Sequence, residues 1–292
     1  MNYLENFLVV GLTCNTEKTI VKDLNRIFKI FDKSKKFCVL IIESDSNDKT
    51  VSKLEIIKKN NYNFNYISLG NLKNKLPNRI QRLSYCRNIY KKHILLDKKY
   101  EYAEYILIMD FDNINYQISK ESLISCFENS KWDAVFANQA YKYYDTYALR
   151  YLNQDLYQDP WLEFFNDRKK NSYFKSIVKF YSKMPYFKKN RSWIRVKSAF
   201  GGAAIYKKKC FLYGKYKTFK INEHFICEHV YFNHLLFRKN MKLFINPNFI
   251  NSGINWHSLK SSFFFKLIFF LIYILGDVLR AKLKKKGFIS HI

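Results

Sequence analysis

The chain has 292 residues, of which 48% are hydrophobic and 18% aromatic, so it can bury a full core and is neither a peptide nor a mostly disordered protein. With 8 glycines and 4 prolines it is not collagen-like or linker-like either. Its 51 Lys and Arg against 24 Asp and Glu give a net charge of +27, which favours a polyanionic partner such as nucleic acid, anionic lipid or a phosphorylated substrate. A Lys-, Asn- and Ile-rich composition also arises from an AT-rich genome, so the charge alone does not choose among these.

Strands and helices are expected to alternate over the first 60 residues. The apolar run at 6–14 is too short for a helix and indicates a buried parallel strand. Apolar residues at helical spacing predict a helix over 20–31, and a second buried strand follows at 37–43. The polar turn at 44–50 leads into another helix, for which Asp48 is a candidate N-cap. This order predicts a right-handed βαβ arrangement.

The middle of the chain continues this pattern and then loses it. We expect a short strand near 64–68, a basic helix that carries Arg87, and a clear strand at 105–110. A further strand is expected at 134–137. From 138 to 195 aromatic and basic residues follow one another without clean periodicity, which favours an insertion on the substrate side over a separate domain.

The last regular elements are expected between residues 199 and 246. A glycine pair, Gly201 and Gly202, precedes a short apolar strand. A helix is predicted over 228–237 and a strand over 242–246. Alternating strands and helices predict an α/β fold, with a mostly parallel central sheet between two layers of helices.

The C-terminal segment, 258–292, is expected to associate with a membrane surface. The run at 263–279 is strongly apolar, but it contains Lys266 and Asp277 and is shorter than the ~20 residues that a spanning helix needs. Basic residues at 280–286 then favour a helix lying on an anionic membrane surface. The alternative is a C-terminal helix packed on the domain's own core.

A cytoplasmic location is expected for the rest of the chain. Its six cysteines are scattered without a CxxC pair and several lie in apolar runs, as is typical of reduced thiols. The N-terminus shows no signal-peptide pattern, because no basic stretch leads the short apolar run. We therefore expect a cytoplasmic protein that is peripheral on the membrane through its C-terminal segment.

Asp110-Phe111-Asp112, at the end of a predicted strand, is the strongest chemical signal in the sequence. Residues i and i+2 of an extended chain point the same way, so the two carboxylates can converge on one divalent cation. Oxygen ligands suit Mg²⁺ or Mn²⁺, which would keep open positions for a diphosphate. Two polar turns, 13–17 and 43–48, are predicted at the same edge of the sheet, where open α/β sheets bind their ligands.

These features, in this order, resemble the nucleotide-sugar-dependent glycosyltransferases of the GT-A fold. The resemblance covers about residues 6 to 257 and rests on the Thr13-Cys-Asn15 turn, the loop at 43–50, Arg87-Asn88 and Asp110-Phe-Asp112. The loop resembles the aspartate-rich turn of family 2 enzymes. Three further stretches are most similar to the capsular α-1,3-mannosyltransferase type: Arg79 to Asn88, Gly201-Gly202 and Cys227-Glu-His229.

The resemblance implies a role for each matching residue. Asp45 and Asp48 would recognise the base or ribose, in a pocket lined by Thr13, Asn15 and Glu43. Arg87 would approach the diphosphate, to which a guanidinium can donate two charge-assisted hydrogen bonds. Arg79 and Arg82 are equally consistent with a solvated basic face.

The same resemblance assigns the metal ligands and the reacting end of the site. Asp110 and Asp112 would hold Mn²⁺ or Mg²⁺, and His257 would complete the metal shell or be an ordinary surface histidine. Gly201 and Gly202 would let the backbone approach the donor sugar, or would simply form a tight turn. Glu228 would lie nearest the acceptor hydroxyl, as a general base or as an orienting group, with a helix-face carboxylate as the alternative. Retention and inversion both stay open.

The resulting prediction is an enzyme, a metal-dependent hexosyltransferase with a catalytic domain over 1–257. It would use a nucleotide diphosphate sugar and a glycan or lipid-linked acceptor, in surface polysaccharide or glycoconjugate synthesis. The alternatives are a basic nucleic-acid-binding protein and a sugar nucleotidyltransferase. No helix-turn-helix, RNP or zinc-finger pattern supports the first, so no nucleic acid partner is expected. The second would need a Gly-rich, basic loop after the first strand, where Thr13-Cys-Asn-Thr-Glu17 stands instead.

Overall fold

Successive residues of the first strand, β1 (Phe7–Thr13), face opposite sides of a central sheet, and both faces are buried. The computed structural model describes residues 3–156, 158–169, 173–221 and 224–259, together with positions 271 and 275; for residues 173, 174, 256 and 257 it describes the backbone alone. Within this part of the chain, nine strands form the central sheet in the order β3-β2-β1-β4-β8-β5-β11-β7-β6.

The strands of this sheet run mostly in one direction. β1 to β4 pair in parallel, and so do β5 and β11, while β8 is antiparallel to both β4 and β5 and so joins the two parallel groups. β7 is also reversed. The strands after β1 are β2 (Phe37–Glu43), β3 (Phe64–Ser68), β4 (Tyr105–Asp110), β5 (Ala134–Gln139), β6 (Arg150–Tyr151), β7 (Ile194–Ser198), β8 (Ala203–Lys207) and β11 (Leu243–Ser252), and a separate hairpin pairs β9 (Lys220–Ile221) with β10 (His224–Phe225).

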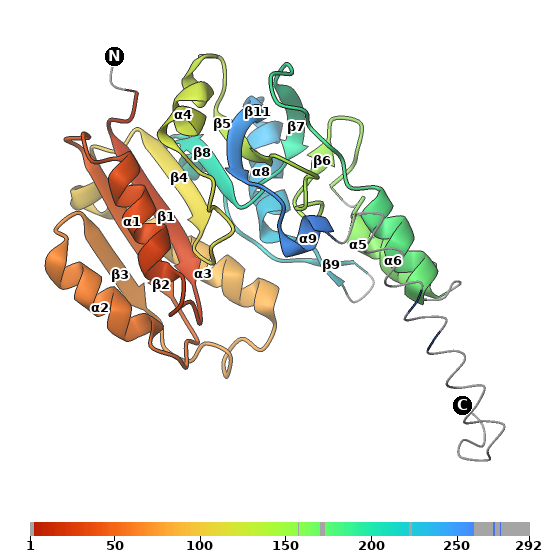
Figure 1. Cartoon of the computed structure of the whole chain (residues 1–292), viewed down its shortest axis with the longest axis horizontal. Coiled ribbons are helices and arrows are strands. Elements are labelled where there is room, and N and C mark those ends of the chain that lie inside the picture. Colours follow the sequence, from red (N-terminus) through yellow and green to blue (C-terminus); the bar gives the residue numbers. More distant parts are fainter. Residues whose placement is uncertain are drawn as a thin grey trace.

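Helices cover both faces of the sheet (Figure 1). The longer helices are α1 (Ile20–Ile30), α2 (Thr50–Asn60), α3 (Arg79–Leu96), α5 (Pro160–Arg168), α6 (Tyr173–Ser182) and α8 (Glu228–Arg238), and the short ones are α4 (Lys120–Ile124), α7 (Cys210–Tyr213) and α9 (Trp256–Leu259). Single 3₁₀ turns lie at Lys98–Tyr100 and Ser125–Phe127.

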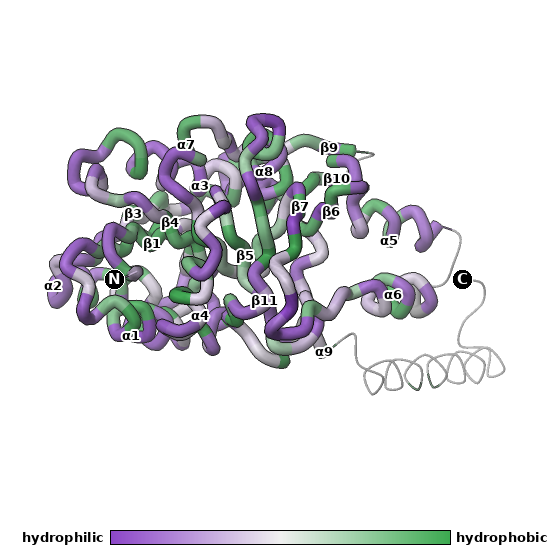
Figure 2. The backbone as a smooth tube through the Cα atoms, turned by 90° about the horizontal axis from the view of Figure 1, so that it is seen from above, coloured by the Kyte–Doolittle hydropathy of each residue, from purple (hydrophilic) through white to green (hydrophobic). Residues whose placement is uncertain are grey.

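Two hydrophobic clusters fill the space between the layers. Leu8 and Val10 of β1 belong to the cluster under α3, α7 and α8, whereas Phe7 and Val9 belong to the one under α1, α2 and α4. This alternation follows from the pleat of the strand, which sends neighbouring side chains to opposite faces. In Figure 2 the strands are accordingly the more hydrophobic part of the trace and the outer helices the more hydrophilic part. The expected three-layer α/β fold is confirmed.

Most predicted elements lie where the sequence placed them, with three differences. The helix after the 44–50 turn begins at Thr50, so its N-cap residue is Lys49 and not Asp48, although the Asp48 carboxylate still accepts a hydrogen bond from Thr50 N at 2.9 Å. The strand expected over 242–246 is longer, because β11 continues to Ser252 past a register shift. Residues 138–195 contain β6, α5 and α6, which the sequence analysis did not predict.

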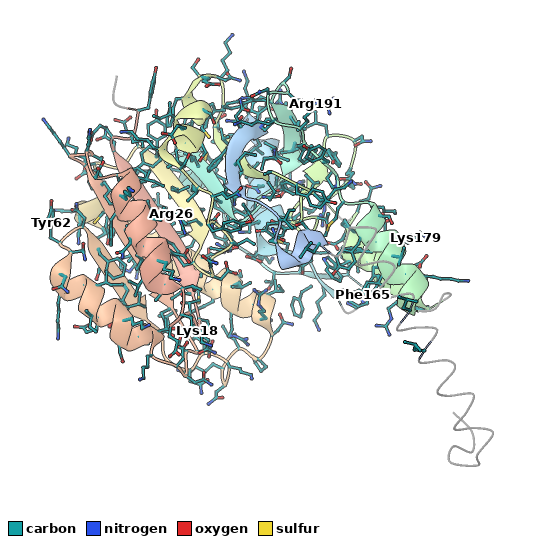
Figure 3. All side chains as sticks on the ribbon, in the orientation of Figure 1. Lys18, Arg26, Tyr62, Phe165, Lys179 and Arg191 are labelled. Atoms are coloured by element: carbon teal, nitrogen blue, oxygen red, sulfur yellow. The ribbon has the colours of Figure 1, made fainter. Side chains whose placement is uncertain are left out.

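The surface carries much of the positive charge. Lys18, Lys179 and Arg191, which Figure 3 labels, are exposed. Among the residues that are described, none of the helices is long and apolar enough to cross a membrane. The predicted membrane-surface helix at 263–279 and the basic run at 280–286 lie outside the described residues, apart from positions 271 and 275.

Candidate active site

An open pocket of about 350 Å³ lies where β1, β2 and β4 end. The carboxyl ends of these parallel strands meet at one edge of the sheet, which is where α/β folds commonly bind ligands. Six of the predicted site residues line this pocket: Thr13, Asp45, Arg87, Asp110, Asp112 and Glu228. The structure therefore brings together residues that are up to 215 positions apart in the sequence, from Thr13 to Glu228.

Asp110 and Asp112 stand on a tightly held turn at the end of β4. Phe111, between them, is 1% exposed and packs into the core, so both carboxylates line the pocket as the i, i+2 argument predicts. Asp112 Oδ1 accepts a hydrogen bond from Ile114 N at 3.2 Å. The next residue, Asn113, has a φ of 68°, and its backbone N–H donates to the buried carboxylate of Asp23 at 2.9 Å. Asp23, which does not line the pocket, thus helps to fix the turn.

Buried amides support the same turn from behind. Asn115 donates to the carbonyls of Asp110 and Gly202, at 2.7 and 3.0 Å, and accepts from Asn251 Nδ2 at 2.6 Å. Asn251 also donates to the carbonyl of Gly201 at 2.7 Å. Both amides are fully buried. A buried polar group is retained at low cost only when it is hydrogen-bonded, so this network locks the end of β4 to the start of β8.

Gly201 and Gly202 allow the end of β4 and the start of β8 to lie close together. Their φ values are 71° and 85°, which L side chains rarely adopt. A Cβ at Gly201 would lie 2.8 Å from the carbonyl oxygen of Ala137, and one at Gly202 would lie 2.6 Å from the hydroxyl of Tyr144. The glycines therefore have a packing role beside the pocket. They do not line it, and their contact with a donor sugar stays a prediction.

Arg87 forms a buried ion pair with Glu228 on the floor of the pocket. The Arg87 Nε atom lies 2.8 Å from Glu228 Oε1, and the two side chains are 4% and 3% exposed. A second carboxylate oxygen, Asp110 Oδ1, lies 3.7 Å from Arg87 Nη2, and Arg87 Nη1 donates to the Tyr90 hydroxyl at 3.2 Å. The phenyl ring of Phe200 covers the guanidinium, whose central carbon lies 5.3 Å from the ring centroid. Arg87 thus joins α3 to α8 and lies close to the turn that carries Asp110 and Asp112.

Several carboxylates lie around the buried Arg87 side chain. Burial and the Asp112 charge raise the pKa of Asp110 to about 7, against the opposing effect of Arg87. Asp145 and Glu228 are further carboxylates in the same pocket, and both add to the shift at Asp110. A cation bound here would offset this repulsion and favour the ionised form of Asp110.

The oxygen ligands of this turn fit a hard divalent cation. No group of three or more His, Cys, Asp or Glu side chains is arranged to hold a metal ion among the described residues. Two carboxylates are nevertheless enough for Mg²⁺ or Mn²⁺, which commonly keep water and phosphate oxygens as their other ligands. The backbone of His257 lies in α9, but its side chain is outside the described residues, so its place in a metal shell stays a prediction.

On the β1–β2 side of the pocket, Asp45 is the acidic residue that faces the cavity. Its backbone has a φ of 64°, and its carboxylate accepts from Lys73 N at 2.7 Å and lies 3.3 Å from Arg82 Nε. Arg82 and Arg79 line the pocket as well. Arg82 is therefore part of the site and not simply a solvated basic face.

Three predicted residues hold the surrounding loops and do not line the pocket. Glu43 is 1% exposed and accepts hydrogen bonds from Ser46 N at 3.0 Å and from the hydroxyl of Ser68. Asn15 accepts from Asn47 N at 2.8 Å. Burial opposes ionisation of Asp48, but hydrogen bonds from Thr50 and Glu17 outweigh it and lower the pKa of this carboxyl. These residues fix the 43–50 loop against the turn after β1, and their nucleotide contacts stay predictions.

Asp145 and His229 are among the pocket residues that the sequence did not predict. Asp145 comes from the 138–195 segment, accepts from Gly201 N at 2.9 Å, and has a pKa that burial raises. In the sequence, the only indication of Asp145 is that it is a single acidic residue among several tyrosines. His229 also lines the pocket and follows Glu228 directly. The sequence analysis included it in the Cys227-Glu-His229 stretch but gave it no role.

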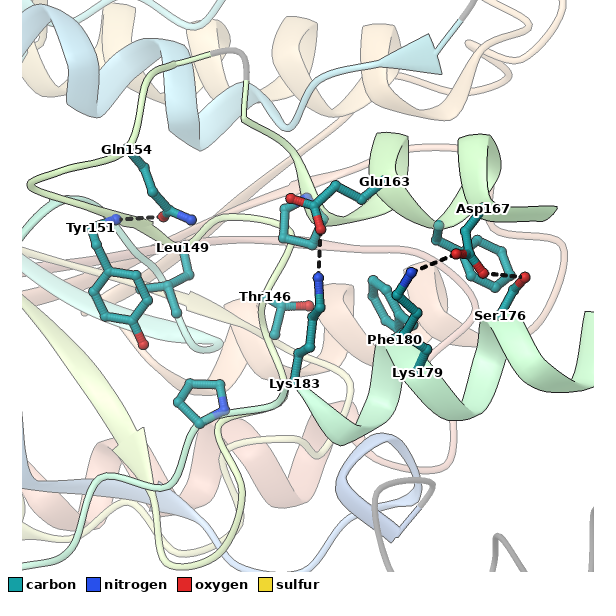
Figure 4. A pocket seen from close by; sticks show the side chains of 13 residues that line it. Thr146, Leu149, Tyr151, Gln154, Glu163, Asp167, Ser176, Lys179, Phe180 and Lys183 are labelled. Atoms are coloured by element: carbon teal, nitrogen blue, oxygen red, sulfur yellow. Dashed lines mark hydrogen bonds and ion pairs between the residues drawn. The ribbon is translucent and has the colours of Figure 1, made fainter. Parts of the chain in front are cut away.

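A second pocket, of about 170 Å³, lies between α5, α6 and the 146–154 segment (Figure 4). None of the predicted site residues lines it. Its charged side chains are paired with one another: Lys183 Nζ lies 2.7 Å from Glu163 Oε2, and Asp167 contacts Lys179 and Ser176. The two pockets therefore differ in kind, because the first gathers carboxylates around the buried Arg87 and the second balances its charges at the surface.

Comparisons with known proteins add the following. The chain matches no protein-family model and no curated protein sequence. Among solved structures it is similar to the mannosyltransferase PcManGT from Pyrobaculum calidifontis in complex with GDP-Man and Mn²⁺, with 13% identity, a TM-score of 0.45, and coverage of 84% of this chain and 55% of that one. For S. aureus TarS 1–349 in complex with UDP the values are 16%, 0.48, 86% and 61%. For glucosyl-3-phosphoglycerate synthase from Mycobacterium tuberculosis in complex with UDP they are 12%, 0.40, 86% and 71%.

The chain thus spans little more than half the length of the first two of these structures. The protein has an α/β fold with an acidic pocket at the ends of its strands. The side chains of this pocket suit a cation and an anionic ligand.

Proposed function

We propose that this chain is a glycosyltransferase of the GT-A type, which moves a hexose from a nucleotide diphosphate sugar to a hydroxyl acceptor with the help of Mn²⁺ or Mg²⁺. The observation that carries the proposal is the pair Asp110 and Asp112, which line a pocket at the carboxyl ends of the parallel strands. Burial, together with the nearby carboxylates, raises the pKa of Asp110, as expected of a site that binds a cation.

In this proposal Asp110 and Asp112 hold the cation. The bound ion would supply a positive charge that offsets the charge developing on the leaving nucleoside diphosphate. The chain's own residues do the rest of the positioning. Asp23 and Asn115 hold the turn that carries the two aspartates, so the carboxylates need little reorganisation when the ligand binds.

The nucleoside part of the donor would lie on the β1–β2 side of the pocket, against Thr13 and Asp45. Arg79 and Arg82 line the same side, where their guanidinium groups suit an anionic ligand. Arg87 lies close to the turn that carries Asp110 and Asp112. Its Nε atom already donates to Glu228, so only its Nη atoms would turn toward a phosphate oxygen. The sequence analysis assigned Arg87 to the diphosphate. In this proposal Arg87 holds both Glu228 and a phosphate oxygen.

A thermal-shift screen tests the proposal directly. The full chain would be heated with UDP-, GDP- and CDP-sugars, each with and without Mn²⁺, because a ligand that binds only the folded state raises the apparent melting temperature. We expect one class of nucleotide sugar to stabilise the protein, and more strongly with Mn²⁺ than without it. If no nucleotide sugar shifts the melting temperature under either condition, the proposed function is wrong.

For the acceptor we propose a glycan or lipid-linked saccharide at an anionic membrane surface, within surface polysaccharide or glycoconjugate synthesis. The proposal rests on the sequence of the C-terminal segment, where apolar residues at 263–279 precede five basic residues at 280–286. It implies a cytoplasmic protein held at the membrane. Removal of residues 263–292 should abolish sedimentation with anionic lipid vesicles, and unchanged sedimentation would contradict this anchor.

A further inference from the structure

His229 is a pocket residue to which the proposed mechanism gives no task. It lies in the first turn of α8, lines the pocket and is 2% exposed. Its ring stacks on Phe200, with centroids 3.9 Å apart and planes inclined by 19°, and it meets the edge of the Tyr216 ring at 5.8 Å. Packing on both sides therefore fixes the orientation of the imidazole.

Both ring nitrogens of His229 are buried, and within the described part of the chain neither has a hydrogen-bond partner. The nearest carboxylate oxygen, Glu228 Oε1, lies 3.9 Å from His229 Nε2, which is too long for a hydrogen bond. A buried polar atom left unpaired is unfavourable and uncommon in folded proteins. An aliphatic side chain would fill this position without that penalty.

The imidazole is held in its neutral form. Burial and the positive charge of Arg87 lower the pKa of His229 well below its usual range. A neutral imidazole has one nitrogen that donates and one that accepts, which is the combination that matches a hydroxyl group. It matches a phosphate less well, because a phosphate offers acceptors alone.

The neighbouring acid, Glu228, is less available for the same task. Its Oε1 atom already accepts from Arg87 Nε at 2.8 Å, and the pair is buried. The other carboxylate oxygen, Oε2, accepts from the Cys227 thiol at 3.8 Å. Of the two adjacent residues at the start of α8, one therefore already holds Arg87 and the other has unused hydrogen-bonding capacity.

We propose that His229 hydrogen-bonds a carbohydrate hydroxyl on the floor of the pocket, and that Glu228 serves mainly to hold Arg87. This inference rests on the proposed function, since it names the part of the site that receives a sugar ring. The hydroxyl belongs either to the sugar of the donor or to the acceptor, which share the same chemistry. Because His229 is almost fully covered, the hydroxyl reaches it only with a small displacement of a neighbouring side chain.

The test compares three variants of the full chain. His229→Leu removes both nitrogens at similar volume, and His229→Gln retains a donor and an acceptor. His234→Leu is the matched control, because His234 lies on the same helix, is partly exposed and does not line the pocket. Thermal unfolding without ligand checks that each variant is folded.

Calorimetric titrations with Mn²⁺ present separate the two sources of the hydroxyl. One arm measures affinity for UDP and GDP and for UDP-glucose, UDP-N-acetylglucosamine and GDP-mannose. The other measures binding of methyl hexosides to protein already loaded with the nucleoside diphosphate. We expect His229→Leu to weaken either the nucleotide sugar or the hexoside by about 3- to 10-fold, with unchanged affinity for the free nucleoside diphosphate. His229→Gln should recover part of the loss, and His234→Leu should lose nothing.

Each outcome either supports or overturns the role proposed for His229. A loss in the first arm assigns His229 to the donor sugar, and a loss in the second arm assigns it to the acceptor. Equal weakening of the nucleoside diphosphate and its sugar conjugate would mean that His229 only supports Arg87 and Glu228, and would overturn the inference. Unchanged binding in both arms would overturn it as well. If the wild-type protein binds no nucleotide sugar at all, the proposed function itself fails, which is a different result from a wild type that binds and a variant that binds equally.

Discussion

The two sides of the pocket are built in different ways. On the β1–β4 side, Asp45, Asp110 and Asp112 stand directly after regular parallel strands. On the other side, Asp145 comes from the irregular 138–195 segment and Glu228 from the first turn of α8. On the first side the strand order brings the acids to one edge, where local contacts then hold them. On the second side each residue depends on a partner from a distant part of the sequence, Gly201 for Asp145 and Arg87 for Glu228.

Two buried ion pairs within the described residues show the same contrast. Arg87 and Glu228 are 141 residues apart in the sequence, and their pairing ties two helices together beneath the site. Arg150 and Asp159 are nine residues apart, with side chains 1% exposed and an Nη2–Oδ2 distance of 2.5 Å. Asp159 also caps α5 by accepting from Trp161 N. The first pair therefore links the fold to the site, while the second organises one local segment.

Loss of the Asp110 or Asp112 carboxylate should have the largest effect on sugar transfer. We expect Asp110→Asn or Asp112→Asn to reduce sugar transfer by about 10²- to 10³-fold, because the cation would lose half of its protein ligands. The folded state should persist, since Asp110→Asn removes a repelling charge and leaves intact the backbone bonds of the turn. Initial rates with the donor found in the thermal-shift screen measure the effect. Near-normal turnover in either variant would remove the metal hypothesis.

Breaking the two ion pairs separately sharpens the comparison. Arg87→Met and Arg150→Met each leave a buried carboxylate without its cation, so each should lower the free energy of unfolding by about 3 kcal/mol. Urea denaturation measures this loss. Only Arg87→Met should also weaken binding of the nucleoside diphosphate, because Arg150 is absent from the pocket lining. Equal donor affinity in the two variants would contradict the position given to Arg87.

The first side of the pocket could be predicted from the sequence, because continuous apolar runs identify buried parallel strands. A strand that ends in Asp110 places this residue at the ligand-binding edge without knowledge of any other contact. The mostly parallel sheet was also predicted, whereas the reversal of β8 between β4 and β5 was not. A five-residue apolar strand carries no mark of its direction.

The second side could not be predicted, because burial and pairing over long distances leave no periodic signal. Glu228 was chosen as the reacting group from its neighbours in the sequence, but nothing there showed that Arg87 occupies its carboxylate. The same holds for His229, whose unpaired nitrogens become visible only when Phe200 and Tyr216 are in place. Asp145 lies in a segment where aromatic residues obscured α5 and α6.

The raised pKa of Asp110 predicts a pH dependence of stability in the presence of a chelator. In the unfolded chain this carboxyl loses its proton near pH 4, whereas the folded protein retains it up to about pH 7. The folded state therefore binds more protons over this window, and its stability falls as the pH rises from 4 to 7. The side chain is 35% exposed, so water screens the repulsion and the loss should be only about 1 kcal/mol.

Asp110→Asn lacks this titrating group and is the matched variant for the pH measurement. Urea denaturation at pH 5, 6, 7 and 8 should show a steeper decline for the wild type than for the variant. Parallel curves would mean that the Asp110 carboxyl is already ionised at pH 5 in the folded protein. Because a cation prefers the ionised carboxylate, Mn²⁺ should also bind the wild type more tightly at pH 8 than at pH 6.

The smallest effect is expected at the second pocket, where charges are paired at the surface. Lys183 and Glu163 are 58% and 59% exposed, so solvent screens their attraction and the ordering of two long side chains opposes it. Lys183→Met should change the free energy of unfolding by less than about 0.5 kcal/mol and leave nucleotide-sugar affinity as in the wild type. A loss of transfer in this variant without a loss of stability would mean that the α5–α6 pocket takes part in the reaction, and the contrast between the two pockets would no longer hold (Figure 4).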